Sequence, residues 1–99
     1  MIYKEALPDG EHVRVTFEIP SSFWAEQVNL VGDFNDWDTS RHEMTQSRAT
    51  GNWRISLILP KGQEYQFRYL INGHNWHNEW HADKYVPNKY GSDNSVVIT

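Results

Sequence analysis

The 99-residue sequence predicts an all-β fold, a β-sandwich. Three observations support this prediction. Several short segments alternate apolar and polar residues with a period of two, which is typical of strands that have one buried face. Turn-forming residues separate these segments at short spacing, as they do in sandwiches. No stretch of ten or more residues has a convincing 3.6-residue apolar repeat, so no amphipathic helix is expected.

Two strands are expected in the first third of the chain. Residues 13–20 read VRVTFEIP, and apolar residues occupy every second position until Pro20 ends the run. Proline has no backbone N–H to donate to a neighbouring strand, so it is a common strand end. Residues 27–34 read QVNLVGDF, where Val28 and Leu30 share one face before a glycine interrupts the pattern. We expect one strand in each segment.

A long hairpin is expected in the second half of the chain. Residues 52–60 read NWRISLILP, and their alternation puts Trp53 on the same face as three aliphatic residues. A Lys-Gly turn follows, and residues 64–72 then read EYQFRYLIN. Two tyrosines, a phenylalanine and an isoleucine share one face of this second strand. The opposite face carries Gln66, Arg68 and Leu70.

Asn72 and Gly73 are a strong signal for a tight turn, because both residue types tolerate the positive φ angles of a type I′ hairpin. The chain is therefore expected to leave this turn extended. Residues 94–99, NSVVIT, read as a last strand. The length fits one domain. We expect residues 11–99 to form a single β-sandwich, preceded by an N-terminal extension at residues 1–10.

The composition argues against several classes of function. The net charge is −4 and the nine Lys and Arg are scattered, so no basic stripe is available to neutralise nucleic-acid phosphates. The chain has no cysteine, which excludes disulfides, thiolate metal ligands and thiol catalysis. Its apolar runs are far shorter than a membrane span, and no signal-peptide pattern follows Met1. We expect a cytoplasmic protein with no nucleic-acid or membrane partner.

Three histidines fall in the stretch NGHNWHNEWHAD at residues 72–83. On a helix they would share one face as candidate metal ligands. An extended chain leaving the hairpin instead puts His77 and His81 on one side and His74 on the other. Their spacing matches the usual zinc-ligand pairs only loosely. We expect surface histidines on a polar loop, with no metal and no cofactor, and metal binding is the alternative.

Two tryptophans lie in unusually polar turns. Trp37 ends the stretch GDFNDW, and Trp76 follows the Asn-Gly turn among asparagines and histidines. Each ring either folds over the core as a lid or stands exposed as an apolar platform. Two such rings at the loops of one small sandwich favour platforms. Flat indoles stack on the apolar C–H face of a pyranose, and neighbouring polar side chains bond its hydroxyls.

Three motifs resemble carbohydrate-binding module family 48. They are VNLVGDFNDW, GNWRISLILPKGQEYQFRYLINGHNW and ADKYVPNKYGSDNSVV, and the likeness covers residues 11–99. The family includes the glycogen-binding domain of the AMP-activated protein kinase β-subunit and the early-set domains of glycoside hydrolase family 13 enzymes. The resemblance implies an immunoglobulin-like (early-set) β-sandwich that binds α-1,4-glucan such as glycogen, starch or maltooligosaccharide. It also implies a glycogen- or starch-metabolising enzyme as a partner.

The resemblance implies roles for individual residues. Trp37 and Trp76 match the two stacking tryptophans of the family. Arg68 falls where the kinase domain has a lysine that bonds sugar hydroxyls, although a guanidinium is not equivalent to an ammonium. Asn94 matches an asparagine that bonds the glucose between the indoles. Tyr90 stands where the kinase domain has a leucine that reaches into the glucan turn, so we expect a third contact there.

Four further positions are assigned by the same comparison of motifs. Ser92 is a further candidate sugar contact. Trp53 matches an aromatic residue of the family that starts a long strand, and its alternation agrees with a core position. Trp80 stands where many members have a proline, and Trp24 lies in a stretch without a clear counterpart. Either of these tryptophans could extend the platform or be structural, and we expect both to belong to the core.

Catalysis is not expected from this chain. Asp33, Asp36 and Asp38 are close enough to suggest the carboxylate pair of a glycosidase. All three sit in one turn, however, and one turn cannot flank both sides of a glycosidic bond. They are better interpreted as solvated turn residues, with Asp33 or Asp36 bonding nearby amides. No serine has an ordered base at a recognisable spacing, so no catalytic residue is assigned.

Two functions of different classes remain. The first is a non-catalytic α-1,4-glucan-binding module that uses stacked tryptophans. The second is an early-set structural or protein-docking module without sugar affinity. The presence of both Trp37 and Trp76 favours the first, because a pure packing module needs no pair of indoles at these turns.

Overall fold

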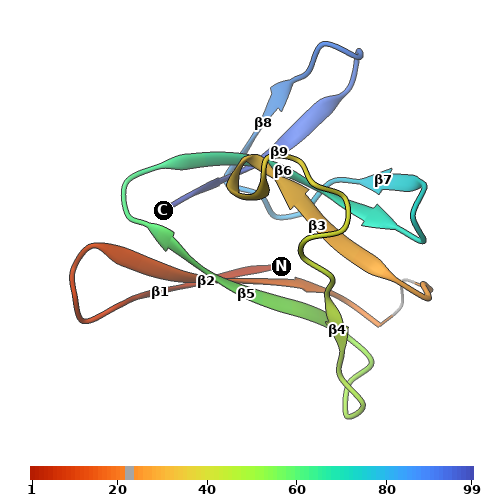
Figure 1. Cartoon of the computed structure of the whole chain (residues 1–99), viewed down its shortest axis with the longest axis horizontal. Coiled ribbons are helices and arrows are strands. Elements are labelled where there is room, and N and C mark those ends of the chain that lie inside the picture. The colour runs from red at the N-terminus through yellow and green to blue at the C-terminus, as the bar shows by residue number, and fades with distance from the viewer. Residues whose placement is uncertain (22–23) are drawn as a thin grey trace.

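The computed structural model describes residues 1–21 and 24–99, which form two antiparallel sheets (Figure 1). In these residues the first sheet has the order β1 (Ile2–Ala6), β2 (His12–Ile19), β5 (Trp53–Pro60) and β4 (Thr45–Gln46). The second has the order β3 (Val28–Gly32), β6 (Glu64–Ile71), β9 (Asp93–Ile98) and β8 (Lys84–Pro87), and β7 (Asn75–His77) also pairs with β6. The described residues contain one 3₁₀ turn, η1 (Asp33–Asn35), and no helix long and apolar enough to cross a membrane. The predicted all-β, immunoglobulin-like sandwich is confirmed.

The alternating segments of the sequence form the central strands of both sheets. β2 pairs with β5 along its whole length, from His12 opposite Pro60 to Ile19 opposite Trp53. β6 pairs with β3 on one edge, and on the other edge first with β9 and then with β7. Strands were expected over residues 13–20, 27–34, 52–60, 64–72 and 94–99. All five are confirmed, and the ends of the observed strands differ only slightly.

The inner faces of the two sheets meet in an aromatic core. Phe17 of β2 and Phe67 of β6 are fully buried, and their ring centroids lie 5.1 Å apart in an edge-on arrangement. Tyr69 packs edge-on against Phe67 at 5.8 Å. Trp53 is only 6% exposed, which confirms its predicted core position. Because successive side chains of a strand point to opposite faces, this core fixes which residues of β6 point outward.

The predicted turn at Asn72 and Gly73 is also confirmed. Their φ angles are 52° and 78°, both in the left-handed region that a type I′ turn requires. The Asn72 side chain also holds the chain that enters β3. Its Oδ1 accepts the backbone N–H groups of Glu26 at 2.8 Å and of Gln27 at 3.2 Å. The chain then leaves the turn as β7, which places Trp76 opposite Leu70.

The structure differs from the sequence prediction in residues 1–10. Ile2–Ala6 of this stretch forms β1, which pairs antiparallel with β2 from Ile2 opposite Phe17 to Ala6 opposite Val13. The stretch therefore contributes an edge strand to the first sheet and is not an extension beside the sandwich. The short strands β4 and β8 were not expected either.

Candidate functional site

The outer face of the second sheet carries an open groove. β6 contributes Gln66 and Arg68 from its outward face, and β7 contributes Trp76. The remaining residues come from the chain after η1, from the loop between β8 and β9, and from β9 itself, which pairs with β6 (Figure 1). The groove is lined by Trp37, Thr39, Gln66, Arg68, Trp76, Asn88, Lys89, Tyr90 and Asn94.

The turn that carries Trp37 is anchored on the sandwich by two earlier residues. Phe34 packs its ring against the phenylalanines of β2 and β6, at centroid distances of 5.8 and 6.3 Å. Asn35 is buried, and its Oδ1 accepts the N–H of Gly32 at 3.1 Å while its Nδ2 donates to the Leu30 carbonyl at 2.9 Å. These contacts satisfy the polar groups of a buried turn. They explain why phenylalanine and asparagine precede the tryptophan.

His42 completes the anchor of the turn. The Asn35 Nδ2 donates a second hydrogen bond to His42 Nδ1 at 2.8 Å, and the His42 ring lies edge-on to Phe34 with centroids 6.4 Å apart. Burial lowers the pKa of the His42 ring. The neutral ring is the form whose Nδ1 accepts a bond, so this pKa shift agrees with the observed geometry.

Trp37 takes an uncommon backbone conformation. Asp36 and Trp37 have φ angles of 56° and 57°, in the left-handed region that non-glycine residues rarely adopt. The Trp37 backbone N–H donates to the Gly32 carbonyl at 2.9 Å, and its indole Nε1 donates to Asp33 Oδ1 at 2.9 Å. The side chain is half-buried and lines the groove. Local hydrogen bonds therefore hold both the backbone and the ring.

Trp76 reaches the same groove from a different element. It lies on β7 opposite Leu70, so its indole shares the outer face with Arg68, two residues before Leu70 on β6. The Trp76 side chain remains 41% exposed. The next residue, His77, lies opposite Tyr69 and faces the other way. The two predicted stacking tryptophans thus line one groove, from a turn and from a short strand.

Polar side chains form the floor of the groove. Asn94 is 8% exposed, and its Nδ2 donates to Gln66 Oε1 at 3.0 Å. Its Oδ1 accepts from Asn88 Nδ2 at 3.1 Å. Arg68 is half-buried, and its Nε has no hydrogen-bond partner among the described residues. A buried donor without a partner is costly, so the floor favours a ligand or water that accepts from Arg68.

Tyr90 lies at the exposed end of the groove. Its side chain is 81% exposed, and Lys89 Nζ lies 5.3 Å from its ring centroid, within the range of a cation–π contact. Asn88 Oδ1 fixes the loop by accepting the backbone N–H groups of Tyr90 at 2.9 Å and Ser92 at 3.2 Å. Ser92 is not among the described residues that line the groove, so its contact with sugar stays a prediction.

Sequence reasoning placed five of these residues in the site and missed others. The missed lining residues are Thr39, Gln66, Asn88 and Lys89. Gln66 was recoverable, because it alternates with Arg68 on the outward face of β6 and had been placed on that face. The alternation of apolar and polar residues could not predict Asn88. This residue lies in a loop, and its contribution comes from hydrogen bonds to Asn94 and to the backbone of Tyr90.

A comparison with known families agrees with this fold. The family model described as "Carbohydrate-binding module 48 (Isoamylase N-terminal domain)" matches residues 6–86. The chain belongs to carbohydrate-binding module family 48. It is therefore a carbohydrate-binding or accessory module. The match includes Trp37, Arg68 and Trp76 but ends before Tyr90 and Asn94.

Curated relatives of this family 48 chain include 1,4-alpha-glucan branching enzymes. The chain is 40% identical over 47 residues to the enzyme of Mesorhizobium japonicum and 48% identical over 44 residues to that of Shewanella sp. strain W3-18-1. It is 44% identical over 50 residues to the enzyme of Novosphingobium aromaticivorans. These segments take 46%, 43% and 50% of this chain, but only 6%, 6% and 7% of the enzymes. The chain therefore corresponds to a small part of each relative.

The predictions for two other tryptophans were wrong. Trp24 and Trp80 were expected in the core, but their side chains are 74% and 61% exposed. Trp24 lies in the connection between β2 and β3, and Trp80 lies in the loop after β7. Neither lines the groove. The family 48 module therefore exposes two indoles at positions outside its candidate site.

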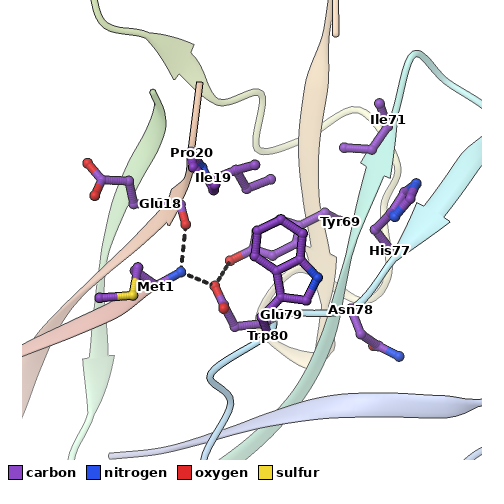
Figure 2. A pocket seen from close by; sticks show the side chains of 10 residues that line it. All are labelled: Met1, Glu18, Ile19, Pro20, Tyr69, Ile71, His77, Asn78, Glu79 and Trp80. Atoms are coloured by element: carbon purple, nitrogen blue, oxygen red, sulfur yellow. Dashed lines mark hydrogen bonds and ion pairs between the residues drawn. The ribbon is translucent and has the colours of Figure 1, made fainter. Parts of the chain in front are cut away.

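The loop that carries Trp80 is held by a buried carboxylate (Figure 2). Glu79 is 3% exposed, and its Oε1 accepts from the Tyr69 hydroxyl at 3.0 Å and contacts the amino nitrogen of Met1. Its Oε2 accepts the N–H of His81 at 2.9 Å. Burial and the neighbouring carboxylate raise the pKa of Tyr69 well above its ordinary value, so its hydroxyl stays a donor. The Trp80 ring lies beside this cluster, over a small hollow between the two sheets.

The structure shows the surroundings of the acidic and histidine residues singled out by the sequence. No group of three His, Cys, Asp or Glu side chains suited to a metal ion occurs within residues 1–21 and 24–99. Asp33 accepts the indole N–H of Trp37 and the backbone N–H of Gln66, a strand residue 33 positions away. Asp38 accepts from the backbone N–H and hydroxyl of Ser40, and these bonds lower the pKa of its carboxyl.

A substitution at Gly32 tests how closely the turn that carries Trp37 packs against β6. A Cβ at this position would lie 2.5 Å from the Gln66 carbonyl oxygen and 2.7 Å from Phe67 Cβ. We expect Gly32→Ala to lower the free energy of unfolding by about 1–3 kcal/mol, because the turn must move away from β6. Urea unfolding followed by circular dichroism measures this change.

Gly62→Ala is the matched control for that substitution. Gly62 has a φ of +79° but no heavy atom within 4 Å of the added Cβ, so this variant has backbone strain without a clash. We expect a loss of about 1 kcal/mol from the positive φ alone. Equal stability of Gly32→Ala and the wild-type protein would contradict the close seating of the turn.

Proposed function

We propose that this family 48 module binds α-1,4-glucan chains in the groove on its second sheet. The observation that supports the proposal is that Trp37 and Trp76 line one groove together with polar side chains. In this proposal the indole rings cover the apolar faces of glucose units, and Arg68 and Asn94, which line the same groove, bond hydroxyls of the same chain. Tyr90 extends the contact at the exposed end of the groove.

The physical magnitudes favour weak, reversible binding. One sugar face that covers an indole removes on the order of 50–100 Å² of apolar surface from water, which contributes roughly 1–3 kcal/mol. Two stacked rings and a few hydrogen bonds must also offset the entropy lost on association. The dissociation constant is therefore expected between about micromolar and millimolar values. This range suits a module that holds an enzyme near a polymer and releases it again.

We propose a non-catalytic role for the module. Glycoside hydrolysis uses two carboxyl groups on opposite sides of the scissile bond. No Asp or Glu is among the described residues that line the groove. The matched relatives are named as branching enzymes, and this chain corresponds to a small part of them. The module would thus serve a glycogen- or starch-metabolising catalytic domain by holding its substrate.

A second candidate function is protein docking without sugar affinity. The exposed indoles of Trp24 and Trp80 favour it, because large apolar side chains outside a binding site are often covered by another protein surface. The groove favours the first candidate. A packing surface has no need of a buried Arg68 donor without a partner or of an asparagine-lined floor.

A titration with matched sugars distinguishes the two functions. We expect maltoheptaose or β-cyclodextrin to shift the indole resonances of Trp37 and Trp76 in a ¹H–¹⁵N spectrum, while cellohexaose at equal concentration does not. The α-1,4 chain curves, so it can follow two rings held on separate elements, whereas a β-1,4 chain is flat. The absence of any shift at millimolar α-glucan would favour docking and reject sugar binding.

A further inference from the structure

The carboxylate of Asp33 joins two parts of the groove. Its Oδ1 accepts the indole N–H of Trp37 at 2.9 Å, and its Oδ2 accepts the backbone N–H of Gln66 at 2.7 Å. Gln66 belongs to β6, whose backbone is fixed by pairing with β9. The indole of a turn residue is therefore tied to a strand. Without this tie, the ring would be free to sample other rotamers, and sugar binding would have to order it.

The hydrogen bonds continue from Asp33 across the floor of the groove. Gln66 Oε1 accepts from Asn94 Nδ2 at 3.0 Å, and Asn94 Oδ1 accepts from Asn88 Nδ2 at 3.1 Å. Asn88 Oδ1 then accepts the backbone N–H of Tyr90 at 2.9 Å. Through the backbone N–H and the side chain of Gln66, these hydrogen bonds connect the indole of Trp37 with the loop that presents Tyr90. Such connected networks rigidify a surface when every member is satisfied.

We propose that Asp33 is a positioning residue that fixes the ring plane of Trp37 before a glucan chain binds. This inference rests on the proposed function of the groove. Asp33 itself is not among the described residues that line the groove, so it acts through Trp37. Because the indole N–H is used internally, Trp37 offers sugar its ring face and no hydrogen bond. A ring held in its binding orientation needs no ordering on association, which raises affinity.

Asp33→Asn is the sharpest variant for this proposal. The strand amide of Gln66 is fixed, so the carbonyl oxygen of the new side chain is expected to keep that bond and to leave its NH₂ group facing the indole N–H. Two donors cannot bond each other, so the variant removes the tie to Trp37 alone. The fold should remain, because Phe34 and Asn35 anchor the turn independently. An unchanged melting temperature checks this point first.

Asp36→Asn is the matched control. It removes the same charge from the same turn, and asparagine tolerates the left-handed φ of 56° found there. Asp36 does not line the groove, and no described residue donates a hydrogen bond to its carboxylate. A loss seen in Asp33→Asn but not in Asp36→Asn is therefore not an effect of net charge.

The first measurement needs no sugar. The exchange rate of the Trp37 indole proton with water, read by ¹⁵N-edited NMR, reports the bond to Asp33 directly. One lost hydrogen bond of about 1 kcal/mol corresponds to about fivefold faster exchange in Asp33→Asn. Asp36→Asn should match the wild-type protein. An exchange rate in Asp33→Asn equal to that of the wild-type protein would overturn the proposal.

The second measurement is a double-mutant cycle on maltoheptaose affinity. Asp33→Asn should weaken binding about fivefold in the wild-type background. In a Trp37→Phe background, which keeps an aromatic face but has no N–H, the same substitution should change affinity less than about twofold. An equal loss in both backgrounds means that Asp33 acts without Trp37, and the proposal fails. If no variant binds any α-glucan, the proposed function fails, while the exchange rates still decide whether Asp33 fixes the ring.

Discussion

Replacing Trp53 with alanine is expected to lower the free energy of unfolding by about 3–5 kcal/mol. The ring is almost completely buried in the core cluster at the start of β5, opposite Ile19 of β2. Its removal would leave a large cavity between the sheets and would expose the apolar residues around it. A domain of this size has only about 5–15 kcal/mol of stability in total, so the variant would be close to unfolding at 37 °C.

Trp53→Phe is the informative comparison. The indole Nε1 of Trp53 is buried and has no hydrogen-bond partner among the described residues. Phenylalanine keeps most of the ring volume and removes this unsatisfied donor, so the two effects partly cancel. We expect a loss below about 1.5 kcal/mol. Urea unfolding at 25 °C measures both variants.

Sugar affinity supplies an independent check on the position of Trp53. Because the ring belongs to the core cluster and does not line the groove, Trp53→Phe should bind maltoheptaose like the wild-type protein. A Trp53→Ala variant that keeps full stability and loses sugar binding would show that this ring belongs to the outer face.

Burial patterns explain which strands the sequence could predict. β5 and β6 bury alternate residues along one face, so a period of two is visible in their apolar residues. β1 is different, because four of its five residues are exposed at the edge of the sheet. An edge strand is stabilised by backbone hydrogen bonds to one neighbour. These bonds do not require apolar residues at alternate positions, so the sequence does not show them. The same reasoning applies to β8, where three of the four residues are exposed.

The candidate site was predictable where a local sequence dictates a turn. In GDFNDW, Phe34 and Asn35 anchor the turn on the sandwich and Trp37 stays half-buried at the groove. Asn72 and Gly73 form the turn before Trp76. No comparable turn motif precedes Trp24 or Trp80. Trp80 departs from the proline common at its position and Trp24 has no clear counterpart, so no motif supported their core assignment, and the structure overrules it. The role of Asp33 required three-dimensional contacts, since its two partners lie 4 and 33 residues away.

Replacing either Trp37 or Trp76 with alanine is expected to weaken maltoheptaose binding at least about tenfold, a loss of about 1.4 kcal/mol each. Each substitution removes one of the two indole platforms of the groove. Isothermal titration calorimetry or NMR titration measures the loss without relying on tryptophan fluorescence, which the substitutions themselves change. The double variant should bind too weakly to detect in the low millimolar range.

The melting temperature of each variant shows whether weaker binding comes from the lost indole or from an unfolded protein. Trp76 is partly exposed on a short edge strand, so Trp76→Ala should change the melting temperature little. Trp37 is half-buried and bonded to Asp33, so a somewhat larger decrease is expected for Trp37→Ala. If either variant is unfolded at 25 °C, that ring is a core lid and the platform interpretation is wrong.

Trp80→Ala is the matched control for both substitutions. It removes an indole of the same size and greater exposure, from a loop whose residues do not line the groove. If sugar stacks only in the groove, this variant should bind maltoheptaose with wild-type affinity while Trp37→Ala and Trp76→Ala do not. A loss of affinity as large in Trp80→Ala would place the glucan on a different surface. An equal, full affinity in all three variants would show that indole stacking does not hold the sugar.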